Sequence, residues 1–164
     1  LTNIKGKNPD AIFYGGLDSQ AGPMLRQMEQ LGMGKVKLFS GDGTCTPKLP
    51  ELASKVAAVA NVTCATGGIA VEKMAGGQDW KKRYDAKFPG QFQIYSPYAY
   101  DATMLLVDAM KRANSVDPKV YIPALQKTNF KGLTAQIQFT PKGELTHPAV
   151  TLNTFKNNVR TPLN

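Results

Sequence analysis

Short apolar runs and amphipathic segments alternate along the first part of the chain. The apolar runs, each bounded by turn-forming residues, predict three buried strands at residues 11–16, 35–40 and 61–68. Helical spacing of apolar residues predicts one helix between each pair of strands, at residues 21–33 and 47–60. This alternation indicates βαβ units and a parallel sheet, with the helices on the faces of the sheet.

The pattern becomes more helical after Gly67 and Gly68. Amphipathic periodicity predicts three helices, at residues 78–89, 95–113 and 117–128. Alternating apolar and polar positions predict two later strands at residues 133–139 and 149–156, and we expect residues 157–164 to trail off. A helix-rich middle between strand-containing ends indicates two lobes, joined by crossings near residues 67–72 and near His147–Pro148.

Charge is the unusual feature of the composition. The formal net charge is +8, from 20 Lys and Arg residues against 12 Asp and Glu residues. The cationic residues are scattered, without a block of five like charges or an interleaving with aromatic residues, so we expect no nucleic-acid partner. No apolar run approaches the ~20 residues that a membrane span needs. No cationic segment followed by an apolar one opens the chain, so we expect any export signal to be absent from these residues.

Most catalytic arrangements find no support in the sequence. His147 is the single histidine, and no G-x-S-x-G elbow, phosphate-binding loop or dinucleotide fingerprint is present. We therefore expect no enzymatic activity, no cofactor and no metal, which disfavours an enzyme of flavodoxin-like architecture. The two cysteines, Cys45 and Cys64, are either two buried thiols or one disulfide. The disulfide is favoured if the protein is exported, and closing that loop should add about 3 kcal/mol of stability.

The loops that follow the first two predicted strands are the candidate binding site, because ligands of open α/β sheets bind beyond the carboxyl ends of the strands. Their sequences are GGLDSQAG and SGDGTC. Asp42 stands between two glycines, and two interpretations remain open. It is either a turn residue that bonds its own backbone, or a carboxylate that holds an ammonium group by charge-assisted hydrogen bonds.

Three tyrosines, Tyr95, Tyr98 and Tyr100, precede or open the longest predicted helix. They either pack the start of that helix or wall an apolar side-chain pocket. Asp101 is most simply a carboxylate in the first helical turn, where the helix dipole favours negative charge.

Four separated motifs give the chain a resemblance to a known family. They are YGG…GPMLRQ…LG, the acidic residue after the next strand, YDATMLLVDAMKRA, and FTPKGE before a last strand. In this order they resemble the type I periplasmic binding proteins for branched-chain amino acids, which are receptors of ABC importers. The resemblance covers essentially the whole chain. It implies an α/β fold with parallel-sheet, Rossmann-like lobes, of which this chain is only the second half.

The resemblance also implies which segment belongs to which lobe. Residues 1–70 and 149–164 would be part of the second, C-terminal lobe, and residues 71–148 part of the first. The fragment would leave apolar sheet edges uncovered, so a dimer or a domain swap is a further expectation.

Roles for single residues follow from the same resemblance. Asp42 corresponds to the carboxylate that receives the α-ammonium group of the ligand, and Cys45, bonded to Cys64, would brace its loop. Leu17 stands where leucine-binding members carry a tyrosine, and we expect it and the adjacent Asp18 among the ligand-binding residues. A cleft-lining aromatic corresponds to Tyr95, with Tyr98 or Tyr100 as alternatives. The groups that grip the α-carboxylate would come from the other half.

The implied function is solute capture without covalent chemistry. Two hinged lobes would close around an amino acid, branched-chain or otherwise aliphatic, and pass it to ABC permease subunits in the membrane. The protein would be exported to the periplasm. An alternative within the same fold is an amide or urea receptor, or a sensory ligand-binding domain.

Overall fold

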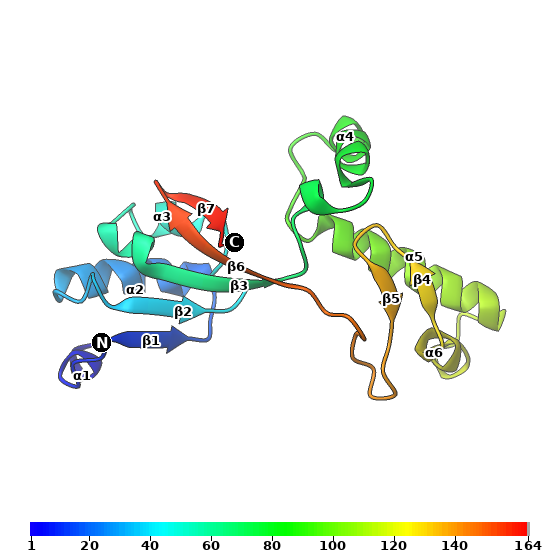
Figure 1. The fold of residues 1–164 in the computed structure, drawn as a ribbon, viewed down its shortest axis with the longest axis horizontal. Coiled ribbons are helices and arrows are strands. Elements are labelled where there is room, and N and C mark those ends of the chain that lie inside the picture. The colour runs from blue at the N-terminus through cyan, green and yellow to red at the C-terminus, as the bar shows by residue number, and fades with distance from the viewer. Residues whose placement is uncertain (164) are drawn as a thin grey trace. The chain divides into compact units, whose positions relative to one another are not determined.

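The structure is a computed structural model that describes residues 1–163. The chain forms two compact units (Figure 1). Unit 1 holds Leu1–Gly67 and the segment that starts at Val150, and unit 2 holds Gly68–Ala149. The chain therefore passes between the units twice. The assignment of these segments to the two lobes of a longer receptor remains a prediction.

Unit 1 is built on a five-stranded sheet with the order β1-β2-β3-β6-β7. The strands are β1 (Ala11–Tyr14), β2 (Lys37–Ser40), β3 (Val62–Gly67), β6 (Val150–Lys156) and β7 (Val159–Pro162). The first three run parallel, whereas β6 is antiparallel to β3 and β7 is antiparallel to β6. The predicted α/β class with a parallel-rich sheet is confirmed.

The helices of unit 1 are α1 (Thr2–Lys5), α2 (Asp18–Gln30), α3 (Leu49–Leu52) and the 3₁₀ helix η1 (Ala57–Asn61). The apolar face of α2, with Leu25 and Met28 fully buried, shares one core with Leu38, Val62 and Phe155 of the sheet. Alternate strand residues point to the other face. That face leaves large apolar side chains exposed, namely Phe13, Phe39 and Leu152.

Two segments of unit 1 differ from the sequence-based prediction. The helix expected over residues 47–60 is broken into α3 and η1, because Ser54 and Lys55 both adopt φ of 53°, a left-handed conformation that ends a helix. The expected tail after residue 156 instead forms β7. Asn157 and Asn158, with φ of 51° and 61°, make the tight turn that returns the chain beside β6.

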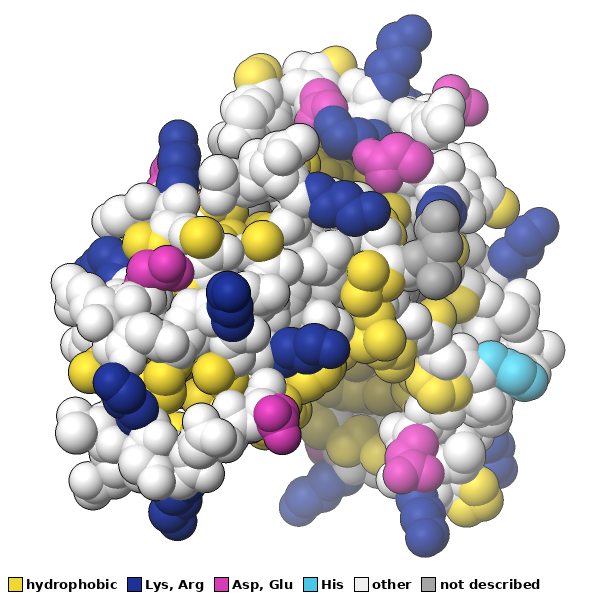
Figure 2. Space-filling view, turned by 60° about the vertical axis from the view of Figure 1, so that its left-hand side comes forward, with side chains coloured by type: hydrophobic (Ala, Val, Ile, Leu, Met, Phe, Trp, Pro, Cys, Tyr) yellow, Lys and Arg dark blue, Asp and Glu magenta, His cyan; other side chains and the backbone are white. Residues whose placement is uncertain are grey.

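Unit 2 is mainly helical. Its helices are η2 (Val71–Lys73), α4 (Gly77–Lys87), α5 (Ser96–Ala113) and α6 (Pro118–Gln126), and its strands are β4 (Asn129–Lys131) and β5 (Gln136–Gln138). The three predicted α-helices are present, whereas β4 was not predicted. The two strands pair as an antiparallel hairpin. Figure 2 shows Lys and Arg side chains spread singly over the visible face of the molecule, as the scattered charge in the sequence indicates.

A buried carboxylate fastens the β4–β5 hairpin to α5. Asp101 is 3% exposed and accepts hydrogen bonds from the backbone N–H groups of Leu133 (2.9 Å) and Thr134 (2.7 Å) and from the Thr134 hydroxyl (2.6 Å). A Cβ on Gly132 would overlap this carboxylate, so only glycine fits there. The interpretation of Asp101 as a first-turn carboxylate favoured by the helix dipole is therefore wrong. The helix begins at Ser96 with no acidic residue in its first turn, and the partners of Asp101 lie in the hairpin.

We predict that Asp101→Asn lowers the stability of unit 2 by about 3 kcal/mol, since an amide would face three donors that need acceptors. Asp108→Asn is the matched control on the same helix, because Asp108 forms a surface ion pair with Arg112 and should matter by less than about 0.5 kcal/mol. Trp80, the single tryptophan, reports the unfolding of unit 2 in urea by its fluorescence. Equal losses in the two variants would contradict the role of Asp101.

Candidate functional site

Two loops meet at the carboxyl ends of β1 and β2. The backbone N–H of Asp18, which begins α2 directly after the first loop, donates to the carbonyl of Gly43 in the second loop, at 2.9 Å. The hydroxyl of Thr44 donates back to the carbonyl of Gly16 at 3.1 Å. A Cβ on Gly43 would lie 2.8 Å from that Gly16 oxygen, so the second glycine of the GDG sequence permits this close approach.

Buried hydroxyl groups hold the second loop on the sheet. Ser40 ends β2, and its Oγ lies 2.7 Å from the hydroxyl of Thr44 and 2.8 Å from the carbonyl of Tyr14 on β1. Ser40 is 5% exposed and Thr44 is fully buried. Buried polar groups with partners rigidify the segment that carries them. The conformation of the GDG loop is therefore set by both of its neighbouring strands.

The predicted disulfide is confirmed and adds a covalent anchor. Cys45, directly after the GDG loop, is bonded to Cys64 in the middle of β3, and both cysteines are buried. The backbone N–H of Cys45 also donates to the carbonyl of Asp42 at 2.9 Å, closing the loop on itself. Arg160 of β7 donates a hydrogen bond to the Cys45 carbonyl at 3.3 Å. Asp42 thus stands on a loop with little freedom to move.

The predicted site residues of unit 1 gather at this edge of the sheet. Asp42 is exposed at the tip of its loop, and Leu17, 58% exposed, lies in the loop directly before α2. The Asp18 carboxylate accepts a hydrogen bond from the hydroxyl of Thr46, so it also braces the two loops. The structure brings these residues together, and their contact with a ligand remains a prediction.

The three tyrosines of unit 2 have different surroundings. Tyr95 is 39% exposed, and its ring meets that of Tyr98 edge to face with centroids 6.3 Å apart. The Tyr98 hydroxyl donates to the carbonyl of Ile69 and accepts from the N–H of the same residue, both at 2.7 Å. Tyr100 instead faces Trp80, with ring centroids 5.6 Å apart. The hydroxyl of Tyr98 is already engaged by Ile69, so this residue could offer a ligand only its aromatic ring.

Burial raises the pKa of the Tyr98 hydroxyl above its ordinary value of 10.0. The hydrogen bond to the Ile69 backbone lowers this pKa in part, and the nearby Asp101 carboxylate raises it further. The hydroxyl therefore keeps its proton, and with it the donor to Ile69, at every physiological pH.

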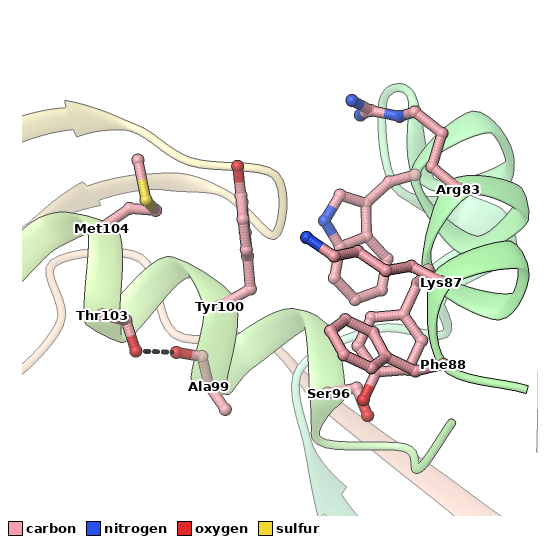
Figure 3. Close-up of a pocket in the computed structure, with 10 residues that line it drawn as sticks. Arg83, Lys87, Phe88, Ser96, Ala99, Tyr100, Thr103 and Met104 are labelled. Atoms are coloured by element: carbon pink, nitrogen blue, oxygen red, sulfur yellow. Dashed lines mark hydrogen bonds between the residues drawn. The ribbon is translucent and has the colours of Figure 1, made fainter. Parts of the chain in front are cut away.

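A broad groove of about 660 Å³ lies between α4 and α5 (Figure 3). Side chains of both helices line it, among them Trp80, Tyr84, Tyr100 and Met104. Figure 3 shows Arg83 and Lys87 on the α4 side and Tyr100 and Met104 on the α5 side. Its charged lining residues are Arg83 and Lys87, both cationic. An ammonium group would find no counter-charge among these lining residues, whereas Asp42 and Asp18 supply one at the loops of unit 1. The groove is therefore the weaker candidate for a zwitterion.

Residues 1–163 contain neither a cluster of metal ligands nor a membrane-spanning helix. In this part of the chain no three His, Cys, Asp or Glu residues are grouped so that they could hold a metal ion. None of the helices formed by these residues is long and apolar enough to cross a membrane.

Comparison with known proteins supports the resemblance drawn from the sequence. The chain is 29% identical over 145 residues to Leu/Ile/Val-binding protein homolog 1 of Brucella abortus, covering 88% of this chain and 38% of the relative. The leucine-binding protein LivK of Thermotoga maritima has the same fold, with a TM-score of 0.82 and 26% identity over 99% of this chain and 46% of that one.

The fold is shared with a binding protein that is named for another solute. A fatty acid ABC transporter substrate-binding protein of Thermomonospora curvata matches with a TM-score of 0.78 and 16% identity, over 99% of this chain and 44% of that one. The fold alone therefore does not select the ligand. The chain spans less than half the length of each relative named here. Residues 1–157 match the family model described as periplasmic binding protein, and the chain belongs to that family.

Proposed function

We propose that this chain is part of a periplasmic receptor that binds an amino acid, branched-chain or otherwise aliphatic, and delivers it to the membrane subunits of an ABC importer. The names of the relatives support the amino acid, since they include Leu/Ile/Val-binding and leucine-binding proteins. Hinge closure of two lobes around the solute would be the functional event, with no covalent step.

The observation that carries the proposal is the anchored carboxylate loop at the end of β2. Asp42 would receive the α-ammonium group, and charge-assisted hydrogen bonds are roughly twice as strong as neutral ones. The disulfide and the Thr44 and Asp18 hydrogen bonds fix the loop before any ligand arrives. A preorganised carboxylate loses little conformational entropy on binding. Less of its attraction for the ammonium group is then offset, and the affinity is higher.

Side-chain selection would depend on residues around that carboxylate. Leu17, exposed beside the GDG loop, would offer an aliphatic contact where leucine-binding members have a tyrosine. Tyr95 would cover the ligand from unit 2. An amide or urea ligand would meet Asp42 through a neutral donor instead, and would depend much less on its charge.

We predict that Asp42→Asn in the full-length receptor weakens leucine binding by about 10- to 150-fold, because the charged hydrogen bonds to the ammonium group contribute about 1.5–3 kcal/mol. Binding of 4-methylpentanoate, which is leucine without its ammonium group, should change less than about twofold. Isothermal calorimetry with both ligands gives the four affinities of the cycle.

Glu51→Gln is the control for that cycle, since Glu51 is an exposed carboxylate of the same unit, on α3. It should leave both affinities unchanged. An equal loss for leucine and 4-methylpentanoate on Asp42→Asn would refute the ammonium contact. A small loss for leucine together with tight binding of an amide would favour the amide receptor.

We also predict that residues 1–164 by themselves bind leucine weakly or not at all, because the chain spans only 38% of its Leu/Ile/Val-binding relative. The groups that grip the α-carboxylate would lie in the remaining part. Calorimetry on the isolated chain should show no binding in the micromolar range, and micromolar affinity would mean that the site is complete within these residues.

A further inference from the structure

The first passage between the units leaves β3 through two glycines. Gly67 ends unit 1 and is exposed, with no atom within 4 Å of the place where a Cβ would stand. Gly68 opens unit 2 with φ of 83°, a conformation that favours glycine. A Cβ on Gly68 would overlap the hydroxyl of Tyr98. This passage therefore has open space around Gly67 of unit 1 and close packing around Gly68 of unit 2.

Tyr98 holds the very next residue by both of its polar backbone groups. Its hydroxyl donates to the carbonyl of Ile69 and accepts from the N–H of Ile69, each at 2.7 Å. Tyr98 comes from the first turn of α5, 29 residues further along the chain, and its ring packs against the core of Val71, Met74 and Trp80. The entry of the chain into unit 2 is therefore fastened to the longest helix.

The second passage is tied to the first on the same side of the boundary. The β3–β6 ladder ends with the pair Gly67 and Val150. One more hydrogen bond follows beyond it, from the N–H of Gly68 to the carbonyl of Ala149 at 2.7 Å. The backbone that enters unit 2 and the backbone that leaves it are thereby held side by side.

We propose that Tyr98 is a positioning residue for lobe closure, which fastens Ile69 to α5 and confines rotation between the units to Gly67–Gly68 and Ala149–Val150. This inference rests on the proposed hinged-receptor function. Without the hydroxyl, Ile69 joins the mobile segment, and the open state samples more conformations. Closing on a ligand then costs more conformational entropy, although Tyr98 need not touch the ligand.

The test compares Tyr98→Phe with Tyr121→Phe in the full-length receptor. Phe keeps the ring and its packing, and unchanged hydrogen exchange of the α5 amides shows that unit 2 is folded. Tyr121 is a half-buried tyrosine of α6 in the same unit and serves as the control. Spin labels on cysteines replacing the exposed Lys35 and Lys111, with the native disulfide intact, report the distance between the units.

We expect Tyr98→Phe to broaden the distance distribution of the ligand-free receptor and to weaken leucine binding by up to about tenfold. Tyr121→Phe should change neither. Amide hydrogen exchange on the unmodified protein gives a second measure, in which the Ile69 N–H is protected. Tyr98→Phe should speed its exchange at least about tenfold while the amides of α5 keep theirs.

The outcomes distinguish the clamp, meaning the two hydrogen bonds by which Tyr98 fastens Ile69, from the proposed receptor function. An unchanged distance distribution and an unprotected Ile69 amide would overturn the clamp, even if leucine binds. A loss of affinity with an unchanged distribution would also overturn it, because Tyr98 would then act as a ligand contact. A broadened distribution in a receptor that binds no amino acid would leave the clamp intact and refute the proposed function.

Discussion

The approach of two backbones at Gly43 and Gly16 is the constraint on which the candidate site depends. Parallel strands β1 and β2 end side by side, so their following loops compete for the same space. The absence of a side chain on Gly43 lets the loops touch, and the bonds from Asp18 and Thr44 then lock them. A residue with a Cβ at position 43 would push the loops apart and move Asp42 with them.

Different interactions make the two units rigid. In unit 1 a buried apolar core and a disulfide support the GDG loop, so the exposed Asp42 stands on a well-packed base. Unit 2 has a smaller apolar cluster of Val71, Met74 and Trp80. It relies on two polar side chains of α5 instead, since Asp101 holds the hairpin loop and Tyr98 holds the entering chain.

Local patterns in the sequence were sufficient for the main helices and the core strands. The disulfide needed more, because it was favoured over two buried thiols only on the expectation of export and on the family resemblance. Periodicity identified α2 and α5, and with only two cysteines a single pairing exists within the chain. The Asn157–Asn158 turn carried a local signal too, because asparagine tolerates left-handed φ and favours tight hairpins, and the sequence analysis missed it. The break at Ser54 and Lys55 carried none, since neither residue is a usual helix breaker.

Long-range polar contacts were beyond the reach of local patterns. Asp101 bonds residues 32 and 33 positions away, and Tyr98 bonds one 29 positions away, so nothing next to either residue marks its partner. The position of the candidate site could be predicted in part, because it depends on topology and not on a long-range contact. The rule that ligands bind beyond the carboxyl ends of parallel strands depends on topology alone, and topology follows from periodicity. The rule could place Asp42 and Leu17 at one edge of the sheet, but not the contact that makes their loops rigid.

A rigid binding loop in unit 1 and a fastened chain entry in unit 2 would both favour closure over a solute. A receptor that closes over a solute gains affinity when the open state has few conformations besides the productive path. An immobilised Asp42 loop removes freedom from the binding surface, and a fastened Ile69 removes it from the passage. The proposed role of Tyr98 leaves the boundary itself to move, at Gly67–Gly68 and Ala149–Val150, where Gly67 has no atom within 4 Å of the position of a Cβ. Motion would therefore be concentrated in a few dihedral angles rather than spread through either unit.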